Sequence, residues 1–251
     1  MTPVLKAVVV GALLLAAAAS ATAQDKRSFA VISELARDVS VVTAQPGSIA
    51  QAGPNPVARL AIPEGTLDKV VLLTAKTAIA NAEAGAPVWL VAPLDTDLFG
   101  PEQSLSEGAT AKLPADLAAA MASRGSTHLL LVTRFRGEAR LPLRGVQMGT
   151  GTLEGLGFYI DRYTPLPAVD GGADVPGFLA PYLYARAVLI DARSGRVLRT
   201  RRIGEGKIIA NVRSTPPADP WNLLSPTDKV QRLSDLIVDD LGALMPVLLA
   251  P

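Results

Sequence analysis

Arginines at alternate positions of two strand-like segments are the residues whose type and spacing most favour chemistry in this sequence. Arg134 and Arg136 end one apolar run, and Arg199 and Arg201 lie in a second strand-like run. Residues two apart on a strand point to the same face, so each pair presents two guanidinium groups side by side. A guanidinium group binds carboxylate or phosphate through paired hydrogen bonds. The spacing therefore predicts a basic strand face that binds an acidic group.

The middle of the chain carries an excess of positive charge. Residues 124–213 contain 14 Lys and Arg against 7 Asp and Glu, and further arginines flank the two pairs. Outward-facing arginines also solubilise a half-exposed sheet or block its edges, and this is the competing interpretation. The arginines that we predict as binding residues are Arg134, Arg136, Arg140, Arg144, Arg199 and Arg201.

Other catalytic and metal-binding chemistry has little support in the sequence. The chain has no cysteine and one histidine, His128, so it offers no thiol nucleophile and no usual zinc ligand set. There is no G-x-S-x-G motif, and we expect His128 to bond to a neighbouring backbone group rather than to serve a catalytic triad. The glycines from Gly149 to Gly157 are misspaced for dinucleotide binding. The sequence therefore predicts no metal site and no cofactor.

Residues 137–181 are unusual in composition. They contain 9 Gly and 5 Pro in 45 residues and join two expected core strands. Connections longer than about 12–15 residues are uncommon in compact domains and are often functional. We expect an irregular insertion. It is either a binding loop or oligomerisation arm, on which Phe158 and Tyr159 would meet a partner or a membrane surface, or a disordered or decorative segment.

The first 23 residues have the pattern of a secretory signal peptide. Lys6 precedes an uncharged, mostly apolar run from Ala7 to Ala19, and small residues at positions 21 and 23 precede polar Gln24. The run is shorter than the roughly 20 residues of a membrane span, which favours cleavage after Ala23 over retention as an anchor. No cysteine follows the run, so it is not a lipoprotein signal. We expect a periplasmic protein, with an extracellular one as the alternative.

The part of the chain after the signal peptide is balanced in charge. It contains 23 basic and 23 acidic residues, which argues against long-range attraction to nucleic acid. No later stretch reaches about 18 apolar residues without a charge, so no transmembrane segment is expected. We expect residues 24–251 to form a single domain, and the sequence leaves the oligomeric state open.

Strand-like and helix-like segments alternate along the first half of the chain. Helices are expected from Thr66 to Gly85 and over Pro114–Ser123. The expected strands are 29–35, 39–43, 88–92, 127–136, 182–190 and 196–203. We expect the first two of these strands to form a hairpin. Strand, helix, strand, helix, strand is typical of an α/β protein.

The end of the chain carries clear local signals. Asp191 and Gly195 suit the turn of a hairpin between the last two strands. Ser225 as N-cap and Pro226 at the first helical position predict a closing amphipathic helix, which we expect to end at Pro246.

Three features resemble the periplasmic α/β domains of the type found in the curli-export lipoprotein and at the amino terminus of the TolB protein. They are an Ala-rich helix and Gly turn before a buried strand (SRGSTHLLLVTRF), the hairpin YARAVLIDARSGRVLRTRR, and the closing helix. The resemblance covers roughly residues 66–245 and implies the fold and a periplasmic location, and it carries over no functional residue. The chain lacks the lipidated cysteine of the curli family, which argues against outer-membrane anchoring and pore formation.

Together these observations predict an α/β fold, with α+β as the alternative. We expect a single mixed sheet of about five to six strands, three helices and an irregular Gly/Pro-rich insertion at about 137–181. The favoured function is a non-catalytic periplasmic envelope protein. It would bind or scaffold a protein, glycan or anionic lipid through the basic strand face and the insertion. The alternatives are a periplasmic hydrolase without a recognisable motif and a small-anion binding module, which would have an arginine-lined pocket.

Overall fold

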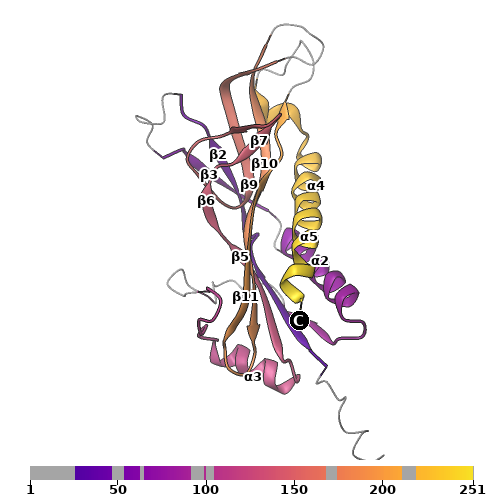
Figure 1. Cartoon of the computed structure of the whole chain (residues 1–251). Coiled ribbons are helices and arrows are strands. Elements are labelled where there is room, and N and C mark those ends of the chain that lie inside the picture. The colour runs from indigo at the N-terminus through magenta and orange to yellow at the C-terminus, as the bar shows by residue number, and fades with distance from the viewer. Residues whose placement is uncertain are drawn as a thin grey trace, which may run out of the picture.

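A computed structural model describes residues 26–46, 54–62, 65–91, 99, 105–167, 174–210 and 219–250 (Figure 1). The signal peptide predicted over residues 1–23 lies outside these ranges, so its cleavage stays a prediction. Within the described ranges, no helix is long and apolar enough to cross a membrane.

One half of the molecule is a three-stranded parallel sheet with helical connections. The strand β1 (Phe29–Glu34) lies between β4 (Val88–Leu90) and β5 (His128–Arg134), parallel to both. Helix α2 (Thr66–Ala82) precedes β4, and α3 (Ala115–Ser123) precedes β5. All six residues of β1 are buried, as expected for a central parallel strand with both faces covered. The predicted mixed α/β class is therefore correct.

The other half is built along one long strand, β10 (Val175–Asp191). Antiparallel to it lie β9 (Thr152–Leu166), β11 (Val197–Gly206) and β12 (Ile209–Ala210). β2 (Asp38–Thr43) joins β9 in parallel, and β3 (Val57–Ala61) pairs with β2 at the edge. The predicted hairpin of β10 and β11 is confirmed, with Asp191 accepting from the Ser194 N–H and hydroxyl in the turn.

The sheet is larger than the sequence predicts. Ten strands belong to it among the described residues, in the order β3-β2-β9-β10-β5-β1-β4, with β11 and β12 on β10 and β6 (Arg136–Glu138) on β9. A separate hairpin pairs β7 (Leu141–Leu143) with β8 (Val146–Met148). The described part of the segment 137–181 is thus regular β-structure, and the expectation of an irregular insertion is wrong there. Its glycines and prolines masked the alternation that identifies strands.

The hairpin expected between the first two strands is also wrong. β1 and β2 do not pair; they follow one another through a bend, with β1 in the parallel sheet and β2 beside β9. Leu35 and Ala36, in the bend, are each 1% exposed, so the link is a buried corner and not a surface turn. Asp68, in the first turn of α2, fixes the corner by accepting from the Ala36 N–H at 3.2 Å and from the Ser33 hydroxyl.

The closing helix begins as predicted but continues past its expected end. Ser225 caps α4 (Pro226–Leu236) by accepting from the Asp228 N–H at 3.2 Å. A π-helical turn, η2 (Ile237–Leu241), and α5 (Gly242–Leu249) follow, and Pro246 lies inside α5. Met245 and Leu248 on either side of the proline are fully buried. Packing therefore keeps the chain helical where a proline in isolation would end the helix.

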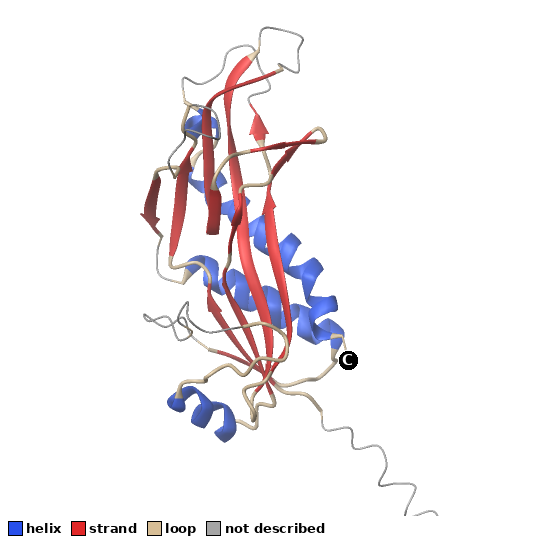
Figure 2. Cartoon of the chain, turned by 60° about the vertical axis from the view of Figure 1, so that its left-hand side comes forward, coloured by secondary structure: helices blue, strands red, loops and turns tan. Residues whose placement is uncertain are grey.

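Helices α2, α4 and α5 cover one face of the sheet, and α3 lies on the other side at its foot (Figures 1 and 2). The largest hydrophobic cluster fills the space between the sheet and α2, α4 and α5. On the opposite face, one cluster lies beneath α3. Another includes residues of β7 and its neighbourhood together with Tyr159, Tyr182 and Tyr184. A short 3-10 turn, η1 (Pro220–Leu223), precedes α4.

Candidate functional site

The sheet divides where β10 changes its neighbour, and a cavity opens at that division. β10 pairs with β9 up to Tyr184 and with β5 from Ala185 onward. The β1–β2 bend lies beside this point. A cavity of about 330 Å³ near this point, here called the fork pocket, is lined by side chains of β2, β3, β5, β6, β9 and β10. It is lined by Ser40, Val42, Val57, Arg59, Arg134, Arg136, Thr152, Glu154 and Tyr182.

Two glycines of β9 make room for the large side chains at the fork. The Arg134 side chain packs over Gly155, whose φ of +68° favours glycine. Tyr182 lies over Gly157, where even a methyl group would come within 2.6 Å of its hydroxyl oxygen. The glycine-rich stretch therefore serves close packing of side chains against a strand.

Arg134 joins the two halves of the bent strand. Its Nη2 lies 3.3 Å from the Asp38 carboxylate, and its Nε donates to the Leu35 carbonyl at 3.3 Å. Arg59 on β3 forms an ion pair with the other oxygen of Asp38 at 3.3 Å. The aspartate thus holds two of the pocket's guanidinium groups. Since Arg134 also bonds to the backbone of the bend, part of its role is structural.

Arg136 is the least restrained cation of the fork pocket. It is exposed, and its Nε donates to the Thr152 hydroxyl at 3.3 Å. Glu154 lines the same pocket and is exposed as well. Arg134 and Arg136 are neighbours in the sequence, on β5 and β6, and Arg59 on β3 joins them from about 75 residues earlier in the chain.

Tyr182 forms the inner wall of the pocket. Its side chain is 0% exposed, and its hydroxyl oxygen is buried with no hydrogen-bond partner among the described residues. Burial raises the pKa of the Tyr182 hydroxyl well above its usual value, and the neighbouring Ser40 side chain offsets only part of this effect. The hydroxyl therefore stays protonated and keeps a proton that it can donate.

Of the sequence-predicted arginines, only the first pair reaches this pocket. Arg140 is exposed and paired with Glu138, and Arg144 is exposed in the β7–β8 turn with a φ of 48°. Arg199 and Arg201 share the predicted strand face, but Arg199 donates to the α5 carbonyls of Leu248 and Ala250. Arg201 pairs with Glu107 at 2.6 Å. The predicted arginines therefore do not form one basic face. Two of them line the fork pocket, and the other four lie elsewhere.

The prediction that Phe158 and Tyr159 contact a partner needs correction. Phe158 is 2% exposed and contacts Trp221 edge-on beneath the helices, and Tyr159 is 0% exposed and stacks on Phe178. Adjacent residues of β9 point to opposite faces, and both faces are covered here. Neither ring is available to a partner at the surface.

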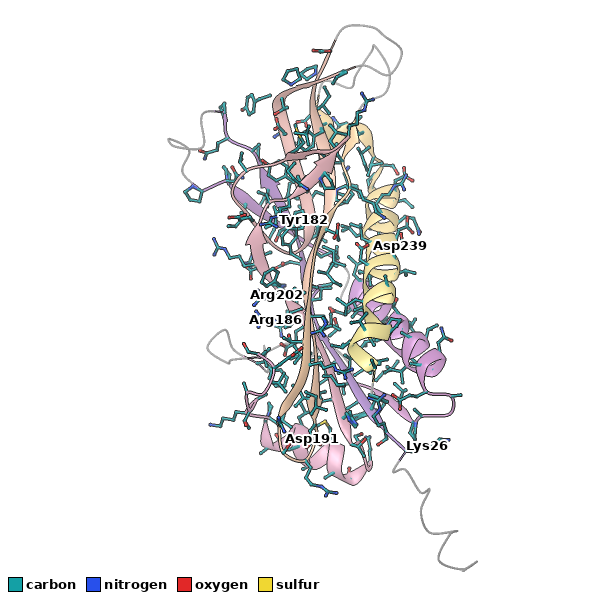
Figure 3. The ribbon with its side chains drawn as sticks, viewed as in Figure 1. Lys26, Tyr182, Arg186, Asp191, Arg202 and Asp239 are labelled. Carbon is teal, nitrogen blue, oxygen red and sulfur yellow. The ribbon has the colours of Figure 1, made fainter. Side chains whose placement is uncertain are left out.

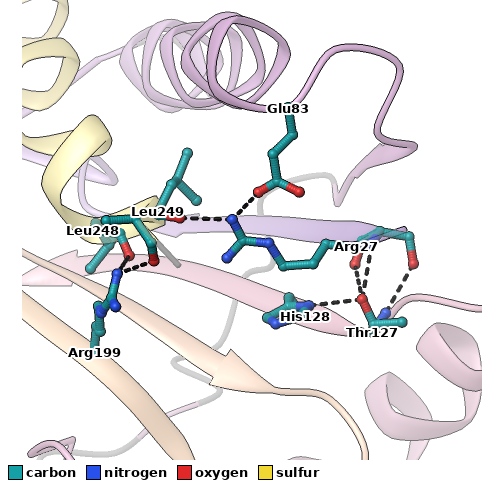
Figure 4. A network of polar contacts seen from close by, with 9 residues as sticks. Arg27, Glu83, Thr127, His128, Arg199, Leu248 and Leu249 are labelled. Atoms are coloured by element: carbon teal, nitrogen blue, oxygen red, sulfur yellow. Dashed lines mark hydrogen bonds and ion pairs between the residues drawn. The ribbon is translucent and has the colours of Figure 1, made fainter. Parts of the chain in front are cut away.

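His128 belongs to a polar network at the end of the parallel sheet (Figure 4). Its Nδ1 lies 2.7 Å from the Thr127 hydroxyl, so its partner is a side chain and not the backbone group that we expected. Burial lowers the pKa of the His128 imidazole, and the nearby Arg27 lowers it further. Arg27 itself pairs with Glu83 and donates to the Leu249 carbonyl at 2.7 Å. Together with Arg199, it anchors the carboxyl end of α5.

The described ranges contain no cluster of three or more His, Asp or Glu residues that could hold a metal ion. A surface pocket beside the π-helical turn η2 is lined by Lys207, Val238 and Asp239 among others. Asp240 lies at this turn, and its Oδ2 is buried without a hydrogen-bond partner among the described residues. Burial raises the pKa of the Asp240 carboxyl, and Lys207 only partly opposes the shift.

Replacing Asp240 by asparagine should stabilise the protein at neutral pH. A carboxyl whose pKa is raised by folding destabilises the folded state once it is ionised, and this cost disappears below about pH 4, where both states are protonated. We expect the melting temperature of Asp240→Asn to exceed that of the unmodified protein at pH 7, with a difference that shrinks as the pH is lowered. Asp239→Asn is the matched control because Asp239 is exposed and paired with Lys207. It should be neutral or slightly destabilising, and an equal gain in both variants would contradict the assignment.

Arg134 and Arg136 were predicted from the sequence as binding residues, whereas Arg59, Asp38 and Tyr182 were not. Arg59 lies in a segment that resembles a loop, because prolines and glycines precede it. The one local signal for the pocket was Gly155-x-Gly157, two glycines on the same face of a strand, which mark a close approach by other groups.

No family model and no curated protein match this chain. Among solved structures, the PelC dodecamer from Paraburkholderia phytofirmans is 14% identical over 87% of this chain and 86% of that one, with a TM-score of 0.32. A neuraminyllactose-binding hemagglutinin homologue from Helicobacter pylori is 8% identical over 90% of this chain and 85% of that one, with a TM-score of 0.41.

Proposed function

We propose that this chain is a non-catalytic, exported envelope protein that binds a partner by an acidic group seated in the fork pocket. The observation that supports the proposal is the convergence of Arg59, Arg134 and Arg136 around one cavity of about 330 Å³. That volume is at the lower end of the range for small-molecule sites, and it suits one sugar ring or one acidic head group. Export is tested by the amino terminus of the protein recovered from the periplasm, which we expect at Gln24.

The electrostatics of the pocket favour an anion. Asp38 neutralises part of the charge of Arg59 and Arg134. Among the described residues Arg136 has the Thr152 hydroxyl as its hydrogen-bond partner, and the exposed Glu154 lines the same pocket. The neutral hydroxyl of Tyr182 adds a donor without a partner among the described residues. A carboxylate or phosphate has several acceptor oxygens, and charge-assisted hydrogen bonds from guanidinium groups are the strongest it can receive here.

Binding is tested with Arg59→Gln/Arg136→Gln, which removes two pocket charges and leaves Arg134 and its contacts to the bend intact. We expect its affinity for an acidic envelope polymer to fall at least tenfold, because each hydrogen bond to a charged group contributes about 1.5–3 kcal/mol. The measurement is co-sedimentation with peptidoglycan, with lipopolysaccharide, or with vesicles containing anionic lipid. The three arms identify the class of partner.

The matched control is Arg140→Gln/Arg144→Gln, which removes the same charge from exposed positions outside the pocket. It should bind within about twofold of the unmodified protein. Equal losses in both double variants would show general charge attraction and overturn the pocket. Failure of the unmodified protein to bind any of the three materials would overturn the proposed function.

The same pocket also favours the second candidate, a small-anion binding module, because a compact arginine-lined cavity is what such a module requires. The two functions differ in whether a free small anion binds as tightly as the polymer does. If free glucuronate or phosphate binds in the fork pocket as tightly as the polymer does, the small-anion function holds. If only the polymer binds, the envelope partner function holds.

A further inference from the structure

Two arginines face each other directly in the middle of the β10–β11 pair. Arg186 and Arg202 are opposite one another in register. Like charges at directly opposed positions of an antiparallel pair repel and destabilise it. Neither side chain forms a hydrogen bond or ion pair within the described residues, and Arg202 is the charged group that acts on Arg186. Burial and this repulsion together lower the pKa of Arg186.

Arg186 and Arg202 lie near the middle of the long sheet, away from α3 (Figure 3). Ala185 and Ala187 pack on the helix-covered face, so the alternation of β10 directs Arg186 to the opposite face. On that face Tyr184 belongs to the cluster that includes β7, whereas Val188 belongs to the cluster beneath α3. Arg186 lies between Tyr184 and Val188 on this face and belongs to neither cluster.

An aromatic ring orients both guanidinium groups. The ring of Phe135 has the guanidinium carbon of Arg202 at 4.6 Å from its centroid and that of Arg186 at 5.9 Å. Cation–π attraction to a shared ring partly offsets the repulsion between the two guanidinium groups. The side chains are thus positioned before any ligand arrives, which reduces the entropy that binding costs.

Unpartnered polar atoms accompany the pair. The Nε of Arg186 and the hydroxyl oxygen of Thr200 are both buried and have no hydrogen-bond partner among the described residues. Thr200 is two residues from Arg202 on the same strand and therefore points to the same face. Two cationic groups and a hydroxyl on one face are the donors that an oxyanion with several oxygens requires.

We propose that Arg186 and Arg202 form a second anion site, which binds a phosphate group between the two guanidinium groups over Phe135. The site is independent of the fork pocket, because none of these residues lines that pocket. A bound phosphate replaces the repulsion between the arginines with attraction to a shared anion. The same chemistry is offered by free phosphate and by a phospholipid head group.

The test is thermal unfolding of the full chain in inorganic phosphate, at an ionic strength kept constant with sodium chloride. We expect phosphate to raise the melting temperature of the unmodified protein and Arg202→Gln to weaken this phosphate affinity at least tenfold. In chloride alone, Arg202→Gln should be as stable as the unmodified protein or more stable, since the repulsion is gone. Arg202→Lys keeps the charge and loses the planar fork, and it should retain only part of the affinity.

Two controls separate this site from general charge and from the fork pocket. Arg193→Gln removes an exposed charge from the β10–β11 turn, and Arg136→Gln removes one from the fork pocket; both should keep the phosphate response. Loss of the response in Arg136→Gln with retention in Arg202→Gln would overturn the proposal in favour of the pocket. If inorganic phosphate does not stabilise the unmodified protein, binding is measured with vesicles of phosphatidylglycerol and, as a control, of phosphatidylcholine. The proposal then requires that the protein binds the phosphatidylglycerol vesicles alone and that Arg202→Gln abolishes this binding. If neither phosphate nor these vesicles engage Arg202, the proposal is wrong.

Discussion

Replacing Gly157 by alanine is expected to destabilise the protein by at least about 3 kcal/mol, a large part of the 5–15 kcal/mol that typically separates folded from unfolded states. The added Cβ would lie 2.1 Å from the Ser40 carbonyl oxygen and 2.6 Å from the Tyr182 hydroxyl oxygen. Neither neighbour can move freely. Ser40 belongs to β2, which pairs with β9 at this residue, and Tyr182 is fully buried. Urea unfolding followed by circular dichroism measures the effect.

Gly242→Ala provides the matched control for this prediction. Gly242 lies in helix α5 with a φ of −58°, and an added Cβ there meets no atom within 4 Å. Alanine should stabilise the helix by about 0.5–1 kcal/mol. If the free energy of unfolding of Gly157→Ala lay within about 1 kcal/mol of that of the unmodified protein, the close packing of β2 and Tyr182 on β9 would be contradicted.

The other large effect is expected at Asp68, whose replacement by alanine should cost about 2–5 kcal/mol. The carboxylate is 2% exposed and accepts from the Ser33 hydroxyl and the Ala36 N–H. Both donors are themselves buried, so alanine leaves them without an acceptor and opens a void beneath the β1–β2 bend. The measurement is again the free energy of unfolding in urea.

Asp116→Ala tests whether this loss reflects the bend or only the position in a helix. Asp116 also lies in the first turn of a helix, α3, but it is exposed. Its removal should cost no more than about 1 kcal/mol, the value of a favourable charge near a helix start. Asp68→Asn keeps one acceptor oxygen and should recover part of the stability. Equal costs at Asp68 and Asp116 would contradict the role given to the bend.

Elements that depend on local signals were predicted well. The start of α4 at Ser225 and Pro226 and the turn from Asp191 to Gly195 occur as expected. The first helix also forms, but Thr66 is its first residue and not the expected cap, since Gly65 holds that position. The end of the last helix was missed because the burial of Met245 and Leu248 outweighs the local effect of Pro246. The pairing of the first two strands was missed because a three-residue link suits a hairpin turn as well as a bend.

The candidate site was only partly accessible from the sequence. The two-residue spacing of Arg134 and Arg136 predicted binding residues that do line the fork pocket. The same spacing also predicted Arg199 and Arg201, which instead contact the end of α5 and Glu107. Spacing determines the face of a strand and not what lies opposite it. Phe158 and Tyr159 show the same limit, because a strand covered on both faces has no exposed side.

The sequence by itself determined the fold class, the helix starts, the hairpin turn and the alternation of side chains along each strand. These features depend on residues a few positions apart, through periodicity, turn chemistry and, for α4, the Ser225 cap. Only the tertiary structure decided that β2 lies beside β9, that Arg59, Arg136 and Tyr182 surround one pocket, and that Arg186 faces Arg202. Those contacts depend on which strands pair and in which register. That choice is made by the burial of whole faces against α2, α3, α4 and α5, and not by any short segment.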